Sequence, residues 1–307
     1  MPLPIGLRRL GRRGYRWAQP AGHGAWRRGP VGNEPAPSVT VGAVPEGHTI
    51  HRLARDHNVD LAGRPVEAVA GQERFREGAD RLHGQVLEKA EAWGKHLFHT
   101  FDSGDVLHVH LGLIGKWFRR VADPRPEPTA TTRLRLAGDH VAWDLTGPMV
   151  CAVVSPDERA QVLARLGPDP LRRRADPERM WAKVQRSSKA IGLLLMEQDV
   201  VAGVGNVYRS ELLNISGIDP RRPGRAVTRN EFDVLWAETV RQLRLGLRRN
   251  KIVTMHSHEL GRPASKVRRG EGLYVYKQYA CGRCHSVLDV FPIAGRTTWR
   301  CPTCQPS

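Results

Sequence analysis

No stretch of this 307-residue sequence approaches the eighteen or more consecutive apolar residues expected of a membrane-spanning helix. An apolar secretory segment is also missing, which argues against a disulfide-bonded secreted domain. Acidic residues are scarce, with 31 Asp and Glu against 48 Lys and Arg, giving a formal net charge of +17. This imbalance indicates a polyanionic partner, nucleic acid in the first place, with ribosomal RNA or an acidic membrane surface as alternatives.

Cysteine is rare, and four of the five cysteines form two C-x₂-C pairs near the C-terminus, with sixteen residues between the pairs (Cys281, Cys284, Cys301 and Cys304). This spacing predicts a zinc ribbon holding one structural Zn²⁺, with two disulfides as the alternative. The ribbon has little apolar content, so metal binding must supply its folding energy, roughly 10–16 kcal/mol in small zinc modules. Cys151 lies in an apolar run and is expected to be a buried small hydrophobe. Thiols kept for metal indicate a reducing cytoplasm.

Residues 1–44 differ in composition from the rest of the chain. They carry seven arginines and a single acidic residue, Glu34, among scattered glycines and prolines. No helical or strand periodicity is visible. The segment is interpreted as a disordered nucleic-acid-binding tail, an Arg-rich targeting segment or translated sequence upstream of the true start.

From Pro45 the pattern predicts an antiparallel β domain that begins with a helix. Ile50, Leu53 and Ala54 share one helical face directly after a Pro-Glu-Gly opening. Strand patterns follow over 93–101, 106–118, 133–136 and 140–145, and the second of these alternates apolar residues as far as Leu113.

The period then changes to that of helices. Pro156 stands at a plausible first helical position. Thr228 and Glu231 form a capping-box pattern before a long amphipathic helix. Between them, residues 189–220 read as a helix, a glycine-punctuated turn and a second helix. Residues 255–272 form a basic loop, and the run 295–298 is interpreted as a turn that presents Arg296 at the tip of a metal-clamped hairpin.

Three separated stretches, PEGHTIHRLA, KAIGLLLMEQDVVAGVGNVYRSELL and the cysteine module ending in GRTTWRCPTCQ, resemble the formamidopyrimidine-DNA glycosylase and endonuclease VIII family. The resemblance runs from Pro45 to the C-terminus. It implies an α+β multidomain fold: an N-terminal antiparallel β-sandwich over 45–166, a helix-two-turns-helix DNA-binding domain over 167–270 and a zinc ribbon over 271–307. It also implies a bifunctional DNA glycosylase and abasic-site lyase of base excision repair.

The family nucleophile, an N-terminal proline, maps onto Pro45. A free proline amine attacks the sugar C1′ and forms an iminium ion, which a tertiary amide nitrogen cannot do. Glu46 matches the general acid that protonates the ring oxygen. Because Val44 precedes Pro45 and a valine codon can serve as a start, residues 1–44 are expected to be a misassigned start, with the mature chain beginning at Pro45. A genuine basic tail that blocks catalysis until it is cleaved is the alternative.

Four further residues match DNA-binding positions of the family. Lys95 matches a strand lysine that contacts the phosphates beside the damaged nucleotide. Lys95 is therefore expected to be a catalytic residue, together with Pro45 and Glu46, as well as a DNA-binding residue. Asn206, after two glycines that permit a tight turn, and Arg296 match phosphate-binding residues. Leu113 is assigned as the apolar wedge that fills the gap left by the extruded nucleotide, with a core strand leucine as the alternative.

The Pro-Glu-Gly opening favours the endonuclease VIII branch, whose usual substrates are oxidised pyrimidines, since the other branch opens with Pro-Glu-Leu-Pro. Thr49 stands where many members have a second glutamate, so lyase activity on abasic sites is the firmer expectation. We expect a bacterial, nucleoid-associated monomer that binds double-stranded DNA containing an oxidised base or an abasic site. The competing hypotheses are a noncatalytic damaged-DNA-binding protein and a zinc-ribbon RNA-binding protein.

Overall fold

The computed structural model describes residues 45–121 and 126–307. The basic extension predicted over 1–44 lies outside the described residues. In chain order the elements are α1 (Gly47–Leu61), β1 (Glu67–Val69), η1 (Glu73–Phe75), α2 (Arg76–Leu82), β2 (Leu87–Trp93), β3 (His96–Phe101), β4 (Val106–His110), β5 (Lys116–Arg120), β6 (Thr132–Ala137), β7 (Ala142–Thr146), β8 (Val150–Val154), α3 (Pro156–Ala164), α4 (Pro177–Val184), α5 (Ile191–Leu194), α6 (Asn206–Ile215), η2 (Gly224–Ala226), α7 (Arg229–Arg249), α8 (Ser257–Leu260), η3 (Ala264–Lys266), β9 (Asp289–Ile293) and β10 (Arg296–Arg300).

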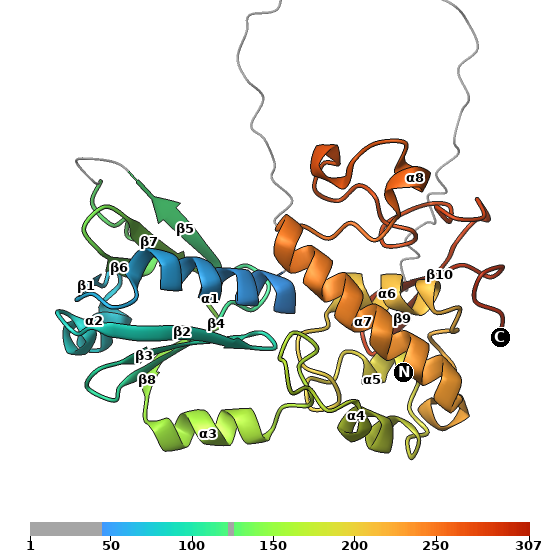
Figure 1. Ribbon diagram of the computed structural model, residues 1–307, viewed down its shortest axis with the longest axis horizontal. Coiled ribbons are helices and arrows are strands. Elements are labelled where there is room, and N and C mark those ends of the chain that lie inside the picture. Colours follow the sequence, from blue (N-terminus) through green and yellow to red (C-terminus); the bar gives the residue numbers. More distant parts are fainter. Residues whose placement is uncertain (1–44, 122–125) are drawn as a thin grey trace, which may run out of the picture. The chain divides into compact units, whose positions relative to one another are not determined.

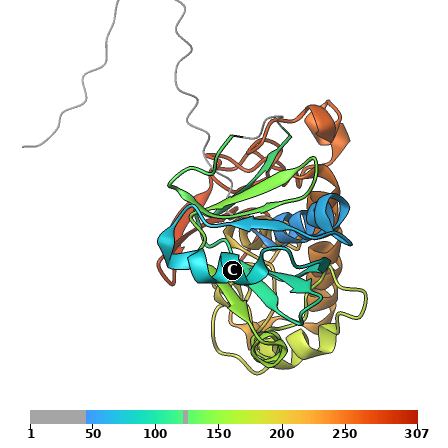
Figure 2. The same cartoon turned by 90° about the vertical axis from the view of Figure 1, so that its left-hand side faces the viewer.

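The N-terminal half is the expected antiparallel β-sandwich. One four-stranded sheet has the order β1-β6-β7-β5 and the other β2-β3-β4-β8, and every strand pair is antiparallel. Figure 1 shows the two sheets as separate layers, and Figure 2 shows them after a quarter turn. Fully buried leucines from both sheets form one core (Leu97, Leu107, Leu134 and Leu145). Each such leucine contributes roughly 1.5–3 kcal/mol by burial.

Helix α1 begins directly after Glu46 and packs on both sheets. As predicted, Ile50, Leu53 and Ala54 are buried. Asn58 binds the backbone of Ala90 in β2, and Asp60 accepts a hydrogen bond from the Trp143 indole in β7. These contacts hold the C-terminal end of α1 on the sandwich. Because the helix is continuous, they also fix the direction of its start, where Pro45 and Glu46 lie.

The strand predicted over 106–118 is wrong as a single element. The chain turns over 111–115 between β4 and β5, where Gly112 has φ +66° and a Cβ on Gly115 would lie 2.3 Å from the Leu111 carbonyl oxygen. Leu111 is buried, whereas Leu113 is 63% exposed, so Leu113 is not the core strand leucine of the alternative reading. The apolar alternation continues through a turn that glycine makes possible.

The helical half has its own core around α4, α5, α6 and α7, and it includes the predicted helix-turn-helix segment. Thr228 and Glu231 form the predicted capping box, in which the Thr228 side chain accepts from the Glu231 N–H and the Glu231 carboxylate accepts from the Thr228 N–H. Helix α3 begins at Pro156, as expected, with Ser155 as its N-cap. The segment predicted as a loop over 255–272 contains α8 and η3, which pack around a small apolar cluster (Val253, Leu260, Ala264 and Val267).

The C-terminal module is a hairpin of β9 and β10 joined by Ala294 and Gly295, which both have positive φ, as a two-residue type I′ turn requires. The turn is therefore shorter than predicted, because Arg296 is already the first residue of β10. In the part of the chain that the structure describes, no helix combines the length and apolar character needed to cross a bilayer.

Candidate active site

The carboxyl group of Glu46 lies at the amino end of α6. It accepts hydrogen bonds from the backbone N–H groups of Gly205 (2.8 Å), Val207 (2.9 Å) and Tyr208 (3.4 Å). The first turn of a helix presents N–H groups that have no partner within the helix, so it favours an acceptor there. These bonds join the start of the described chain, at Glu46, directly to the start of α6.

Glu46 is completely buried, and burial raises the pKa of its carboxyl group above the ordinary value, against the opposing effects of Lys95 and of the three N–H donors. Burial lowers the pKa of Lys95, with Glu46 opposing this effect and the positive charge of Arg296 adding to it. The charges of three predicted site residues, Glu46, Lys95 and Arg296, are therefore electrostatically linked. Pro45, directly before Glu46, is also buried.

Lys95 was predicted to lie within a strand. It lies instead in the two-residue turn between β2 and β3. Its neighbour Gly94 has φ +57°, and a Cβ there would lie 2.8 Å from the Cβ of Ala202 and 3.1 Å from the Gly203 nitrogen. The turn places Lys95 where the sandwich meets the segment before α6.

Three glycines from separate segments make this close approach possible. The Gly47 N–H donates to the Gly203 carbonyl over 2.8 Å, and a Cβ on Gly47 would lie 2.9 Å from the Gly203 Cα. Gly203 itself has φ +97° and faces both Gly47 and Gly94. Backbone therefore packs on backbone at the point where the segments bearing Glu46, Lys95 and Asn206 converge.

Asp169 is a site-building residue that the sequence reasoning missed. Its buried carboxylate accepts from the Gly94 N–H (2.7 Å) and contacts His51 Nε2 on α1 (2.7 Å). It thus ties the turn that carries Lys95 to α1 and to the segment that follows the sandwich. An isolated acid between two prolines in LGPDPL was the available signal, since such a residue must find partners if it is buried.

Asn206 is the first residue of α6, and its side-chain amide donates to the Thr297 carbonyl over 3.1 Å. Thr297 follows Arg296 on β10, and the Arg296 side chain is exposed. The structure thus places both predicted phosphate-binding residues side by side. A second donor to the same carbonyl, Arg209, was not foreseen, because one more arginine in so basic a chain carries no distinguishing signal.

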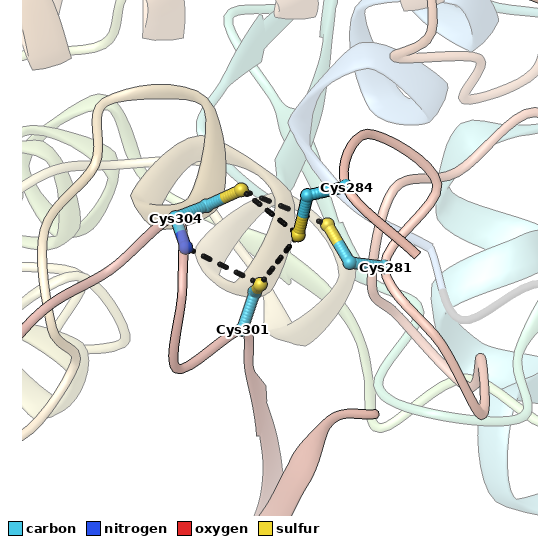
Figure 3. A group of neighbouring side chains, drawn as sticks. All are labelled: Cys281, Cys284, Cys301 and Cys304. Atoms are coloured by element: carbon cyan, nitrogen blue, oxygen red, sulfur yellow. Dashed lines mark hydrogen bonds between the residues drawn. The ribbon is translucent and has the colours of Figure 1, made fainter. Parts of the chain in front are cut away.

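The four predicted metal ligands converge. The Sγ atoms of Cys281, Cys284, Cys301 and Cys304 all lie within 4.8 Å of one another, and Figure 3 shows them pointing toward a common centre. Backbone N–H groups approach the sulfurs of Cys281 (3.5 Å, from Arg283) and Cys301 (3.3 Å, from Cys304), as suits thiolate ligands. No disulfide joins these described cysteines. Four converging thiols fit a tetrahedral metal site.

Cys151 lies on β8, partly buried against the sandwich core. Burial raises the pKa of its thiol, which disfavours the nucleophilic thiolate.

The chain is similar to known proteins over most of its length. The N-terminal domain model of formamidopyrimidine-DNA glycosylase matches residues 44–152, and the H2TH domain model of the same enzyme matches residues 166–257. Endonuclease 8 1 of Mycobacterium tuberculosis is 46% identical over 268 residues, which cover 85% of this chain and 100% of the relative. A formamidopyrimidine-DNA glycosylase of Stutzerimonas stutzeri is 31% identical over 281 residues, with 85% and 98% covered.

A solved complex between the Lactococcus lactis Fpg and DNA containing an abasic site has the same fold, with a TM-score of 0.72, 22% sequence identity, and 85% and 100% of the two chains covered. Sandwich, helical domain and cysteine cluster together define a DNA-repair glycosylase scaffold. The chain belongs to the formamidopyrimidine-DNA glycosylase and endonuclease VIII family of base excision repair. The higher identity to an endonuclease 8 than to a formamidopyrimidine-DNA glycosylase agrees with the branch predicted from the Pro-Glu-Gly opening.

Proposed function

We propose that the protein is a bifunctional DNA glycosylase and abasic-site lyase that uses the Pro45 amine as nucleophile and Glu46 as general acid. The observation that carries the proposal is the position of Glu46: it adjoins Pro45, is buried, and is held by the first turn of α6. Its raised pKa lets it hold a proton closer to neutral pH than an exposed glutamate does.

In the proposed reaction the lone pair of the Pro45 nitrogen forms a bond to C1′, and the bonding pair of the glycosidic bond leaves with the base. The proton that the Pro45 nitrogen then loses neutralises the departing base. Glu46 then gives its proton to the ring oxygen O4′ as the nitrogen lone pair forms a double bond to C1′ and the C1′–O4′ bond breaks, leaving an iminium ion. Loss of a C2′ proton expels the 3′ phosphate, a second elimination expels the 5′ phosphate, and water releases the amine. The scheme requires Pro45 to be the N-terminal residue of the active form.

The clamp for the damaged strand is proposed to consist of Lys95, Asn206 and Arg296. All three carry donors suited to phosphate oxygens. The grouping is supported by the bond from Asn206 to the residue after Arg296, and by the opposing electrostatic effects of Glu46 and Arg296 on Lys95. Leu113, exposed in the β4–β5 turn, is proposed as the wedge that replaces the extruded nucleotide in the base stack.

The zinc site is proposed to be structural. Cys301 directly follows β10, so the metal would fix the C-terminal end of the strand whose first residue is Arg296. When bound, zinc would supply cross-linking energy to a hairpin with few apolar residues. The domain limits 45–166, 167–270 and 271–307, a monomeric state and a cytoplasmic location remain predictions.

Double-stranded DNA with an oxidised pyrimidine or an abasic site is the proposed substrate, supported by the similarity to an endonuclease 8. The test compares strand cleavage by a form beginning at Met1 and a form beginning at Pro45, on duplexes carrying thymine glycol, 8-oxoguanine or an abasic site. We expect only the second form to cleave, with thymine glycol and the abasic site preferred. Tight binding by both forms without cleavage would instead favour the noncatalytic alternative.

A further inference from the structure

Arg209, on α6, is among the largest completely buried side chains of the described residues. Its Nη2 donates to the Thr297 carbonyl over 2.9 Å, whereas within the described part of the chain its Nε and Nη1 are buried without a hydrogen-bond partner. A buried guanidinium with unmet donors lowers stability. A buried group with this cost calls for a functional explanation.

The contact of Arg209 lies one peptide unit beyond Arg296. Arg209 and Asn206, three residues apart on one face of α6, both donate to the Thr297 carbonyl, over 2.9 and 3.1 Å. Arg296 stands immediately after the two-residue turn, at the end of the hairpin farthest along the strand from Cys301. The shared carbonyl is thus an attachment point next to the exposed arginine.

Helix α6 also binds the segment that leads into the cysteine module, residues 274–276. The carboxylate of Glu211 accepts from the backbone N–H groups of Tyr274, Val275 and Tyr276 over 2.7–2.9 Å. That attachment precedes Cys281, and Cys301 of the cysteine cluster lies at the far end of β10. Without Arg209, the Thr297 carbonyl would keep, among the described residues, only the longer and neutral bond from Asn206.

Arg209 is unsuited to binding DNA itself. Two of its three nitrogen atoms are buried, so a phosphate oxygen has no access to them. Burial lowers the pKa of Arg209 to about 10, so the guanidinium stays charged at neutral pH. The charge of Arg296 disfavours that of Arg209, while Glu46 favours it. Arg209 must therefore act through its neighbours.

We propose that Arg209 is a positioning residue, which fixes the Thr297 carbonyl so that Arg296 is presented toward the phosphate of the damaged strand. This inference rests on the proposed phosphate-binding role of Arg296. In this proposal Arg209, a buried side chain of the helical domain, controls the orientation of Arg296 on the cysteine module.

The test is a double-mutant cycle on DNA affinity in the zinc-loaded form beginning at Pro45. Dissociation constants for a duplex with a tetrahydrofuran abasic analogue are measured across a salt series for wild type, Arg209→Met, Arg296→Ala and the double variant. Arg209→Lys keeps the positive charge and places its hydrogen-bond donors on a single nitrogen, so it is the conservative variant. Far-UV circular dichroism and zinc content check that each variant is folded. Arg221→Met is the matched control, because Arg221 contacts Phe291 on β9 and also carries one charge.

We expect Arg209→Met and Arg296→Ala each to weaken binding about tenfold or more, as for loss of a charged hydrogen bond. The double variant should bind no more weakly than Arg296→Ala alone. Each single variant should lower the salt slope by about one, although Arg209 itself touches no phosphate. Arg209→Lys should recover part of the affinity, and Arg221→Met should change little.

Additive losses in the double variant, or an unchanged salt slope in Arg209→Met, would overturn the positioning role while leaving the proposed function intact. Normal affinity of Arg296→Ala would instead remove the phosphate clamp on which the inference rests. The two failures are therefore distinguishable.

Discussion

Gly205 leaves the space that the Glu46 carboxyl group occupies, since a Cβ on Gly205 would lie 2.5 Å from the Glu46 Cδ. Gly205 has φ −126°, which any residue can adopt, so its requirement for glycine comes from the glutamate and not from backbone strain.

Gly205→Ala should therefore displace Glu46 and lower the rate of base excision at least a hundredfold, because general acid catalysis typically contributes 10²–10⁴-fold. Single-turnover excision from a thymine glycol duplex measures this rate. Gly138→Ala is the control, since a Cβ there meets its nearest side chain at 3.5 Å, an ordinary contact. Equal rates for Gly205→Ala and wild type would show that the position of Glu46 does not matter.

Loss of the proposed metal should weaken DNA binding. It should leave the sandwich folded, because the cysteine cluster and the sandwich core share no residues. Cys304→Ser should lose zinc and bind the abasic duplex at least tenfold more weakly. Cys151→Ser should keep one zinc per chain and normal affinity. Elemental analysis and fluorescence anisotropy measure both quantities, and undiminished binding by a zinc-free chain would contradict the structural role.

Leu113→Ala should slow excision of a base that must be extruded from the duplex more than it slows cleavage at a preformed abasic site. The wedge compensates for lost stacking, which costs a few kcal/mol per step, and an abasic site has little stacking to lose. Val59→Ala, at another exposed apolar side chain, should change neither rate. Equal slowing on both substrates would remove Leu113 from the extrusion step.

Acid should unfold the sandwich through a buried histidine pair. His57 Nδ1 lies 2.8 Å from His99 Nε2, and both rings pack near Trp117. Burial lowers the pKa of His99 to about 3 and that of His57 well below its ordinary value. In this pH range the two histidines bind protons in the unfolded chain but stay neutral in the folded chain. The free energy of unfolding therefore falls as the pH drops from about 6.5 toward 3.

Urea titrations between pH 7.5 and 4.5 measure this dependence. Replacing both histidines with leucine should remove up to two protons from the uptake on unfolding. The slope of the free energy of unfolding against pH should therefore fall by at most about 2.7 kcal/mol per pH unit. Neutral substitution of the exposed His140 should leave the slope unchanged. The same slope in the double variant and in wild type would show that other groups control acid unfolding.

Much of the fold followed from local pattern, because capping boxes and apolar periodicity act within a few residues. Thr228 with Glu231 correctly predicted the start of α7, and the C-x₂-C spacing predicted the cysteine cluster. The break after Leu111 was missed, since the alternation of apolar residues continues through the turn. A turn that depends on Gly112 and Gly115 adopting special backbone positions is invisible to periodicity.

The site was predictable only in part. Glu46, Lys95, Asn206 and Arg296 were named from family resemblance, but neither resemblance nor periodicity shows what holds them together. Asp169 and Arg209 act through backbone contacts with Gly94 and Thr297, distant in sequence. Contacts of this kind depend on tertiary packing, so they could be found only in the structure.

The most direct test of the central claim is borohydride trapping on an abasic duplex, followed by peptide mapping of the adduct. The account predicts that the form beginning at Pro45 is trapped through the Pro45 nitrogen, that Glu46→Gln and Gly205→Ala trap more slowly, and that the form beginning at Met1 is not trapped. An adduct on a lysine such as Lys95, or no adduct while the duplex is bound, would contradict it.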